Sequence, residues 1–316
     1  MTQAAAGAAT AMEGQERVRA IVSRSEIQAL CRRSDRPGLI FLAGHLATLL
    51  ATGLLIWATR GTGWILAAMF LHGVVIVHLF APFHEAAHGT AFRSRWINVA
   101  VAWATGLVLM LGPLYFKYEH IAHHSHTQHP GKDPQMIPIA ERLGGYLYYA
   151  TAIPYFIGVF RSLANHALGR FSPVELAVLP PAVRPAVRRE ARLMWAAYLA
   201  VAAASLLLQS WAALAFWLVP RVIGEPVMRL IRMSEHVGRP RVPDLLRNTR
   251  SVETLAPIRW LAWNNAYHAE HHAIPLVPFF ALPALHARLG PHLEEVAPGY
   301  LAAQLRLIRN GLAARA

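Results

Sequence analysis

The sequence predicts an all-α integral membrane protein, for three reasons. Hydrophobic residues make up 55% of the 316-residue chain and charged residues only 15%, whereas charged residues are about a quarter of an ordinary soluble protein. Several apolar runs have roughly the 20 residues that a helix needs to cross a bilayer. The net charge of +13 is spread over loops beside these runs, which favours orientation in a membrane over binding to nucleic acid.

The first 37 residues are expected to form an N-terminal cytoplasmic tail. Residues 1 to about 15 are small and polar, so we expect a disordered start. Six arginines follow between positions 16 and 36, which is typical of an amphipathic approach to the cytoplasmic face of a membrane. The single cysteine, Cys31, excludes an internal disulfide and any zinc or iron–sulfur site built from cysteines.

Two apolar runs predict a first transmembrane hairpin. Residues 38–58 are broken only by His45 and are long enough to cross about 30 Å of hydrocarbon. After a short turn, residues 64–83 return the chain. At about 1.5 Å per residue from Gly63, His84 lies about 31 Å along a straight helix. The first histidine cluster therefore emerges at the cytoplasmic edge of the bilayer.

Two further apolar segments, 96–116 and 144–160, are expected to stay on the cytoplasmic side. The first lies between two histidine clusters that should share one side of the membrane, and a single crossing would separate them. The second precedes an arginine-rich stretch, 161–192, which a single crossing would place outside. We therefore interpret both as re-entrant or interfacial helices.

Residues 193–236 predict a second hairpin with a short polar tip. Counted from Trp211, Arg221 and Glu225 fall about 15 to 21 Å along the second arm, inside the hydrocarbon. This i, i+4 pair is expected to face the interior of the helix bundle. The same helix reaches His236 at about 37 Å, just beyond the membrane.

Histidines are concentrated at the cytoplasmic ends of these segments. An H-x-x-H-H group has a near-copy about 150 residues earlier, and on a helix its first member shares a face with the other two. A third group has the i, i+4 spacing of two ligands one helical turn apart. Together with the histidine that ends the second hairpin, nine histidines are candidate metal ligands. They are His84, His88, His120, His123, His124, His236, His268, His271 and His272.

The type and number of these ligands narrow the choice of metal. Neutral imidazole binds iron, zinc, copper and nickel, so histidine alone does not name the ion. One zinc ion needs three or four protein ligands, and nine histidines at one membrane face suit two ions better. Such a pair can bind and split O2, and iron has the redox states that zinc lacks.

Carboxylates accompany the clusters and are expected to orient the imidazoles. A ligand histidine usually donates its second ring N–H to a carboxylate or carbonyl group, which fixes the ring. A helical neighbour points about 100° away, so these acids are predicted to contact ligands rather than metal. An acid on a helix surface near a membrane edge remains the alternative for each. The candidates are Glu85, Glu270 and Asp133, with Glu119 and Glu235 in similar positions.

Three segments resemble the histidine boxes of the membrane fatty-acid desaturase and hydroxylase superfamily. They are HEAAH at 84–88, HIAHH at 120–124 with Thr127 and Asp133-Pro134 after it, and YHAEHH at 267–272 with a proline-rich stretch after it. The likeness covers roughly residues 38–290 in order and spacing.

The resemblance implies a membrane-embedded catalytic domain over 38–290. This would be a four-helix transmembrane bundle with interfacial helices, under a cytoplasmic, histidine-rich cap that holds two iron ions on the eight box histidines and His236. In part of the superfamily an asparagine four residues before the additional histidine binds through water, and Arg232 occupies that position here. Both termini would be cytoplasmic, with 291–316 as an amphipathic C-terminal tail.

The reaction that the resemblance implies is O2-dependent oxidation of an unactivated C–H bond. A separate protein of ferredoxin, rubredoxin or cytochrome b5 type would supply two electrons. Loss of two hydrogens desaturates a CH2–CH2 unit, and the last box most resembles those of enzymes that act on fatty acyl chains. Oxygen rebound would instead make the protein a hydroxylase or ketolase of a lipid, a carotenoid or a small amphiphilic metabolite.

Two alternatives come from other classes of protein. His84, Glu85 and His88 also match H-E-x-x-H, in which two histidines bind zinc and the glutamate activates water, as in a membrane metalloprotease. That interpretation leaves six box histidines without a role. A metal carrier would place histidines and charges along a path through the membrane. The residues that favour a carrier are His45, His72, His78, Arg221 and Glu225.

Overall fold

The computed structural model describes residues 14–310, and its regular structure is almost entirely helical. Most of the expected disordered start and the last six residues of the expected C-terminal tail lie outside the described residues. A helical stretch at 14–21 is followed by α2 (Arg24–Leu30), where Ser23 and Glu26 form a capping box.

α3 (Asp35–Thr59) and α4 (Ile65–Val77) form the first predicted hairpin, and α5 (Phe80–His88) continues α4. α5 ends at Gly89, whose φ of 71° is a left-handed conformation that glycine adopts without strain. The first histidine cluster therefore sits in the last turns of this hairpin, before the chain reverses.

Two histidines inside the hairpin connect its helices. His45 Nε2 on α3 lies 3.0 Å from the carbonyl oxygen of Val75 on α4. His72 Nδ1 on α4 lies 2.7 Å from Thr52 Oγ1 on α3. Both side chains are buried, and interhelical hydrogen bonding of this kind explains their presence in apolar helices.

α6 (Arg95–Leu109) and α7 (Pro113–His126) occupy the segment predicted to be re-entrant or interfacial, and they are bent by 96° across the break between them. Met110 adopts a φ of 63° at the break. Pro113 then begins α7, where its missing N–H costs nothing. α7 therefore runs in a new direction and carries the second histidine cluster toward the first.

Glu190 on α11 (Arg184–Leu207) caps the start of α7. Its carboxylate accepts hydrogen bonds from the backbone N–H groups of Leu114 (2.7 Å) and Tyr115 (3.2 Å). A carboxylate at this position also faces the positive end of the helix dipole. The contact ties α7 to the second hairpin.

The apolar segment predicted at 144–160 is split into two helices. α8 (Leu143–Ala150) has 8 residues and α9 (Ile153–Leu168) has 16, fewer than the roughly 20 that a crossing needs. The 3-10 turn η1 (Pro138–Glu141) precedes them and α10 (Pro173–Val178) follows.

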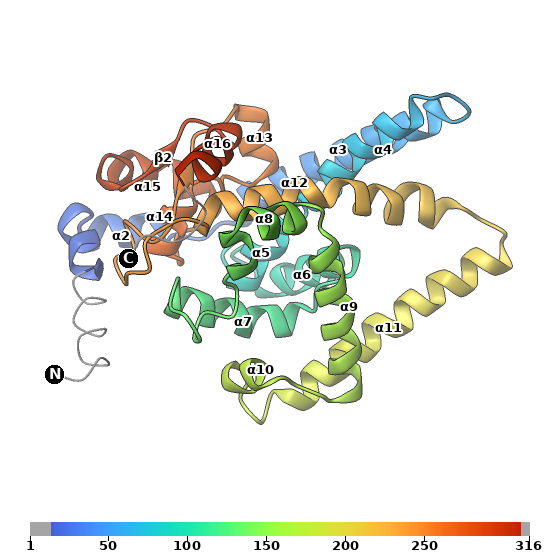
Figure 1. Ribbon diagram of the computed structural model, residues 1–316, viewed down its shortest axis with the longest axis horizontal. Coiled ribbons are helices and arrows are strands. Elements are labelled where there is room, and N and C mark those ends of the chain that lie inside the picture. Colours follow the sequence, from blue (N-terminus) through green and yellow to red (C-terminus); the bar gives the residue numbers. More distant parts are fainter. Residues whose placement is uncertain (1–13, 311–316) are drawn as a thin grey trace.

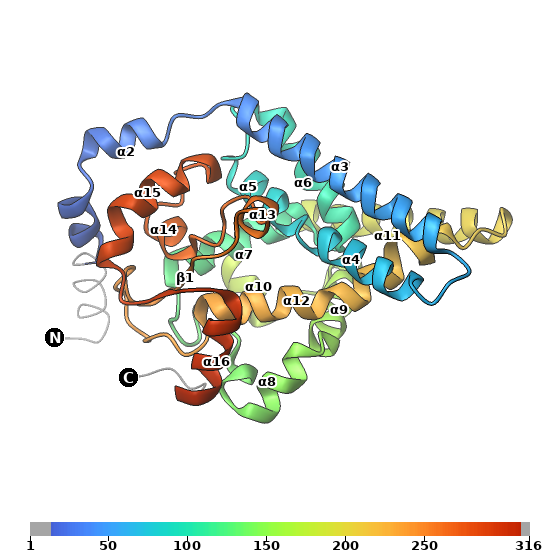
Figure 2. The same cartoon turned by 90° about the horizontal axis from the view of Figure 1, so that it is seen from above.

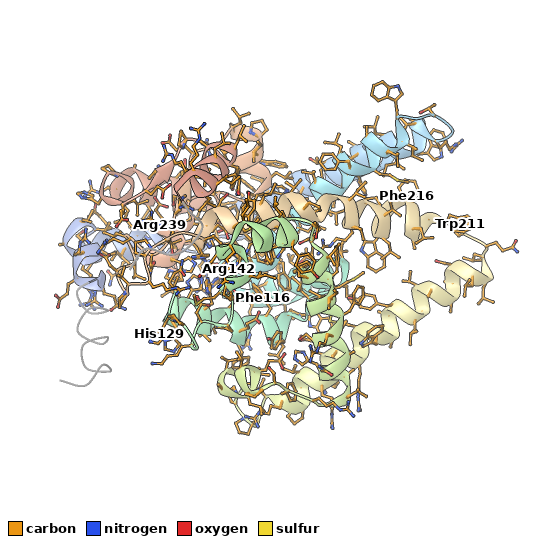
Figure 3. The ribbon with its side chains drawn as sticks, in the orientation of Figure 1. Phe116, His129, Arg142, Trp211, Phe216 and Arg239 are labelled. Carbon is orange, nitrogen blue, oxygen red and sulfur yellow. The ribbon has the colours of Figure 1, made fainter. Side chains whose placement is uncertain are left out.

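The two arms of the second hairpin pack against different helices. After its tip, a π-helical turn, η2 (Leu214–Leu218), leads into α12 (Val219–His236). α12 packs along α4, whereas α11 packs against α9 and α7. The two arms diverge from a shared tip near Trp211 (Figures 1 and 3), and Trp211 is 75% exposed there.

α4 and α12 cross in close contact at Gly73 and Gly224. A Cβ atom added at Gly73 would meet the Pro220 carbonyl, and one added at Gly224 would meet the backbone of Gly73. Small residues let membrane helices approach each other in this way. This crossing fixes how far His236, at the end of α12, lies from α5.

The predicted Arg221 and Glu225 pair is buried and includes a third charge. Both Arg221 and Arg229 form ion pairs with Glu225. Arg221 also donates to the Tyr155 hydroxyl at 3.2 Å, and the Arg229 guanidinium lies 3.8 Å from the centre of the Tyr155 ring. The charges of Arg221, Glu225 and Arg229 therefore lie in the protein interior beside α9, and each has a partner.

The C-terminal part of the chain folds over the end of the molecule that holds α5. Two short strands, β1 (Ser251–Val252) and β2 (Val296–Ala297), pair in parallel. Trp263 is fully buried, and its ring centre lies 5.9 Å from that of Phe41 on α3, which fastens this part to the first hairpin. The helices here are α13 (Ala256–Leu261), α14 (His268–Ala273), η3 (Phe279–Ala281), α15 (Leu282–Leu289), η4 (Gly290–His292) and α16 (Tyr300–Asn310).

Both hairpin tips lie at one end of the molecule and α14 and α15 at the other (Figures 1 and 2). Among the described residues, three helices can cross a membrane by length and composition: Asp35–Thr59, Ile65–His88 and Arg184–Leu207. The bent pair of α6 and α7 would make a fourth if it counted as one span. α12 is not among these helices because it carries several charged residues. The four-helix transmembrane bundle therefore stays a prediction.

Candidate metal centre

All nine predicted histidines meet where four helices from distant parts of the chain converge. α5, α7 and α14 carry the three boxes, and the ninth histidine is the last residue of α12. Two of these helices belong to the predicted hairpins, one to the bent segment and one to the C-terminal part. The fold therefore brings the clusters to one place.

Five histidines form a first group, and their ring nitrogens lie within 4.8 Å of one another: His84, His88, His120, His124 and His271. His120 Nε2 lies 2.7 Å from His84 Nε2 and 3.0 Å from His124 Nε2. His271 Nε2 lies 3.2 Å from His124 Nε2. All three boxes contribute to this group.

The other four histidines form a second group beside the first. The ring nitrogens of His123, His236 and His272 lie within 4.8 Å of one another. His268 Nε2 joins them, 3.1 Å from His236 Nε2 and 3.2 Å from His272 Nε2. Glu235 Oε2 lies 3.5 Å from His268 Nε2, so this carboxylate, expected to contact ligands only, is also placed where it could contact a metal ion. The rings of His272 and His124 stack with centres 4.2 Å apart, so the two groups adjoin.

The spacing of these nitrogens fits metal ligation. Two imidazole nitrogens about 2.1 Å from one ion and at right angles to each other are about 3.0 Å apart, and the contacts above span 2.7–3.2 Å. A neutral imidazole has only one N–H, so rings that meet nitrogen to nitrogen leave lone pairs without a donor. Within residues 14–310, His88 Nε2 and His123 Nε2 are buried and have no hydrogen-bond partner. Each group can therefore hold a metal ion.

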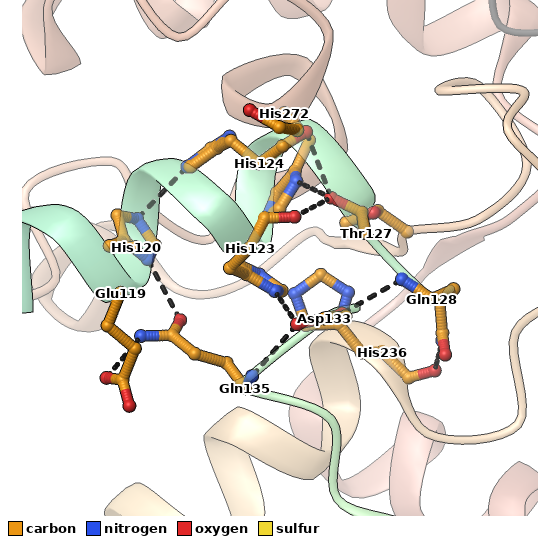
Figure 4. A network of polar contacts seen from close by, with 12 residues as sticks. Glu119, His120, His123, His124, Thr127, Gln128, Asp133, Gln135, His236 and His272 are labelled. Carbon is orange, nitrogen blue, oxygen red and sulfur yellow. Dashed lines mark hydrogen bonds and ion pairs between the residues drawn. The ribbon is translucent and has the colours of Figure 1, made fainter. Parts of the chain in front are cut away.

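A second set of contacts orients two of the imidazoles from outside (Figure 4). His123 Nδ1 lies 2.8 Å from Asp133 Oδ1, and His120 Nδ1 lies 2.9 Å from Gln135 Oε1. A ring that donates its Nδ1–H outward presents the lone pair of Nε2 to the centre. The backbone N–H groups of Gln128 and Gln135 both donate to Asp133 at 2.9 Å, which holds the carboxylate in place.

The second group is oriented in the same way by a hydroxyl and an amide. His272 Nδ1 lies 3.1 Å from Thr127 Oγ1, which itself donates to the carbonyl oxygen of His123 at 2.8 Å. His268 Nδ1 lies 3.3 Å from Asn265 Oδ1. Each contact turns an Nε2 lone pair toward the other histidines.

The electrostatics of α14 favour neutral, metal-binding imidazoles. Burial first, and then the neighbouring histidines, lower the pKa values of His268, His271 and His272 well below their usual range. A neutral imidazole is the form that binds a metal ion. At physiological pH these three side chains are therefore ready to act as ligands.

Glu85 is fully buried between the first and third boxes. Its carboxylate accepts hydrogen bonds from Thr90 Oγ1 (2.8 Å) and from the backbone N–H of Phe279 (3.3 Å). Its Oε1 atom lies 3.8 Å from His84 Nδ1 and 3.9 Å from His271 Nδ1, beyond hydrogen-bond distance. Glu85 thus faces two ligand candidates without a direct hydrogen bond to either, so the structure does not show it orienting a ring.

Glu270 differs from the expectation that it orients a box histidine. Its carboxylate contacts Ser251 Oγ and His286 Nδ1, the latter at 2.5 Å. The hydrogen bond to Glu270 raises the pKa of His286. Glu270 therefore joins α14 to β1 and α15, because a residue one position before His271 on a helix points away from the centre.

Sequence reasoning missed two residues of this centre. Gln135 follows the second box and links His120 to Glu119, whose Oε2 lies 3.1 Å from Gln135 Nε2. His286 lies outside the regular spacing of the histidine boxes. Its contact with Glu270 depends on the packing of α15 against α14. For Gln135 the available signal was its place two residues after Asp133, in the same loop.

Comparisons with known proteins match most of this chain to one family. The family model described as fatty acid desaturase matches residues 56–303. The sphingolipid delta(4)-desaturase/C4-monooxygenase of Homo sapiens is 25% identical over 296 residues, which cover 90% of this chain and 81% of the human protein. The Rattus norvegicus protein of that name is 27% identical over 248 residues (75% and 70%), and a Drosophila melanogaster sphingolipid delta(4)-desaturase is 22% identical over 263 (78% and 73%).

Helices that could span a membrane, clustered histidine boxes and the family match together indicate a membrane oxidoreductase of lipid metabolism. The chain belongs to the fatty acid desaturase family, whose model matches most of its length. The resemblance drawn from the three boxes is thereby confirmed. The protein is an enzyme that oxidises or desaturates a lipid.

Proposed function

We propose that this protein is an O2-dependent di-iron oxidoreductase that desaturates a CH2–CH2 unit in a lipid acyl chain. The observation that carries the proposal is the pair of adjoining histidine groups, five and four residues in size. Two iron ions held there would supply the redox chemistry that reduces O2 and oxidises a C–H bond. The nine histidines would be their ligands.

The roles of this chain's own residues follow from the contacts. Asp133, Gln135, Thr127 and Asn265 would orient ligand rings by accepting their Nδ1–H groups. Glu85 would be a buried acid beside the Nδ1 atoms of His84 and His271. The burial of most of these side chains excludes bulk water, which protects a reactive site from side reactions.

The proposal includes a cytoplasmic active site with both termini on that side. Arginines between 161 and 192 and in the N-terminal tail support this orientation, since cytoplasmic loops collect positive charge. Electrons would come from a separate ferredoxin, rubredoxin or cytochrome b5 type protein.

Hydroxylation is the second candidate reaction, and one observation supports it. Two of the relatives carry names that combine a desaturase with a C4-monooxygenase activity. Both reactions begin by removing one hydrogen from a CH2 group, and they differ in whether a second hydrogen leaves or oxygen is added. A ketolase reaction would extend hydroxylation by a further oxidation.

The metalloprotease alternative has less support in the geometry. It needs only His84, Glu85 and His88, yet His84 and His88 are grouped with His120, His124 and His271. A carrier path is likewise weakened, since His45 and His72 already form hydrogen bonds between helices.

The test is product analysis of lipids from cells that express the protein. Mass spectrometry should show lipids that lack two hydrogens under air and none under anaerobic growth. The His268→Ala variant should give no product, and His129→Ala, at an exposed histidine outside both groups, should give wild-type levels. Lipids that gain one oxygen would favour hydroxylation, and unchanged lipids with an active reductase present would contradict the proposal.

A further inference from the structure

A cavity of about 460 Å³ opens beside the metal centre, between α5, α6 and α7. This volume lies within the range of about 300–1,000 Å³ that is typical of small-molecule sites. His88, a member of the first histidine group, lines it. The cavity therefore reaches the edge of the first histidine group.

Four cationic side chains line the same cavity: Arg33, Arg93, Arg95 and Lys117. They come from three places in the chain, namely the segment before α3, the α5–α6 loop with the start of α6, and α7. All four are exposed. The lining contains no aspartate or glutamate, so the cavity presents positive charge alone.

Local hydrogen bonds explain why these cations share one mouth. Ser94 donates from its backbone N–H and from Oγ to the Asp35 carboxylate, at 2.8 and 2.7 Å, which joins the start of α6 to the start of α3. Asn98 Nδ2 donates to the carbonyl oxygen of Phe92 at 2.8 Å and closes the loop that bears Arg93. These hydrogen bonds hold the backbone segments that carry Arg33, Arg93 and Arg95 close together.

The protein neutralises these cations only in part. No ion pair joins any of them to an acidic side chain within residues 14–310. The Asp35 carboxylate, which accepts hydrogen bonds from Ser94, keeps its negative charge and offsets part of the charge of Arg93. An anion placed in the mouth would therefore meet several uncompensated positive charges.

Apart from Asn98 and His88, the remaining wall of the cavity is apolar. Val99, Ala102 and Trp103 contribute from α6, and Pro113 and Leu114 from the start of α7. On the outer face of α6, Trp96 is 72% exposed and suits the membrane interface. The cavity thus has one charged end and one apolar side, as an amphiphile has.

We propose that this cavity binds the lipid substrate and selects an amphiphile with an anionic head, a carboxylate or a phosphate. Arg33, Arg93, Arg95 and Lys117 hold the head, and the chain lies along α6 and past His88. The inference rests on the proposed function only in naming the bound lipid as substrate. Binding itself requires neither iron nor O2.

The test measures binding to metal-free protein in nanodiscs of zwitterionic phosphatidylcholine. Three radiolabelled probes share one chain length: dodecanoate, dodecyl phosphate and dodecanol. Arg93→Gln/Arg95→Gln should weaken binding of one or both anionic probes by about tenfold and leave dodecanol unchanged. Comparison of variant with wild type on the same probe removes differences in partition into lipid.

Two matched variants and a salt series complete the design. Arg93→Lys/Arg95→Lys keeps the charge and should keep the preference for anions, and Arg189→Gln removes an exposed charge outside the cavity and should change nothing. If the glutamine variant fails to fold, wild-type binding of the anionic probes should still weaken with added NaCl. Equal losses for all three probes, or anionic binding indifferent to both charge and salt, would overturn the inference.

The assay separates this inference from the proposed function. If the anion preference is found and no lipid is oxidised in cells, the cavity is still an anionic-amphiphile site and the proposed reaction is wrong. If lipids are oxidised and no anion preference is found, the reaction stands and the cavity does not select its head group. The ratio of the two anionic affinities distinguishes a carboxylate from a phosphate head.

Discussion

His236 Nε2 lies 3.1 Å from His268 Nε2, so the last residue of α12 meets the first residue of α14. One belongs to the second hairpin and the other to the C-terminal part of the chain. The four-histidine group therefore forms where the second hairpin meets the C-terminal part of the chain. If the packing between these two parts were lost, His236 would separate from His268 and the four-histidine group would be disrupted.

Removing His236 should remove one metal ion and leave the other. His236→Ala takes a ligand from the four-histidine group and leaves the five-histidine group intact. Metal analysis of the purified variant should give about half the iron of the wild type, with turnover lowered by at least about 100-fold. His129→Ala, whose side chain lies at the edge of the molecule (Figure 3), is the control, and full iron in the His236 variant would contradict the two-group arrangement.

Asp133→Asn should weaken metal binding while the fold is kept. The amide can still accept from His123 Nδ1, but it lacks the charge that strengthens that hydrogen bond. Affinity for iron should fall by about 10- to 100-fold, measured by competition with a chelator. Lys132→Gln, at the exposed neighbouring residue, should leave the affinity unchanged, and equal effects of the two substitutions would refute a specific role for Asp133.

Gly73→Val should destabilise the protein by separating α4 from α12. The new side chain would meet the carbonyl of Pro220, and overpacking of this kind costs about 1–3 kcal/mol. Thermal unfolding in detergent should occur at a lower temperature, and iron content should fall because α12 carries His236. At Gly158 an added Cβ has no neighbour within 4 Å, so Gly158→Val serves as the control; a Gly73 variant as stable as that control would show that the helices do not pack this closely.

The contact between Glu175 and His166 should make stability depend on pH in the acid range. Burial alone would raise the pKa of Glu175, but hydrogen bonds from His166 and Ser172 lower it from 4.5 to about 2. A carboxyl group with a depressed pKa in the folded state stabilises the protein above its unfolded pKa, and this contribution is lost as the pH falls toward about 2.

The measurement compares unfolding temperatures of wild type and Glu175→Gln across that range. The wild type should be the more stable above about pH 4.5, and the difference should shrink as the pH falls toward about 2. A difference that stays constant from pH 7 to pH 3, or grows, would show that Glu175 does not act through its charge.

The meeting of the box histidines could be predicted because their spacing is local. An i, i+4 or H-x-x-H-H pattern on a helix places its members on one face whatever the rest of the chain does. His236 was found from the length of a helix, since about 1.5 Å per residue carries it to the end of the hairpin. The Arg221 and Glu225 pair was predicted to face the interior, and its side chains are buried.

Contacts between distant segments could not be predicted in the same way. The pairing of Glu270 with His286 depends on how α15 packs against α14, and the cap that Glu190 places on α7 joins residues about 75 positions apart. The divergence of α11 from α12 depends on the packing of α11 against α9. The helical spacing of residues along the sequence does not predict such contacts between distant segments.

Iron content together with Mössbauer spectroscopy of protein grown on ⁵⁷Fe tests the central claim, a centre of nine histidines that holds two iron ions. We expect two iron atoms per chain, both lost on removal of the metal with a chelator and both restored on reconstitution. Each should have a spectrum typical of nitrogen-rich ligation. A single zinc ion per chain, or no bound transition metal in active protein, would contradict the account.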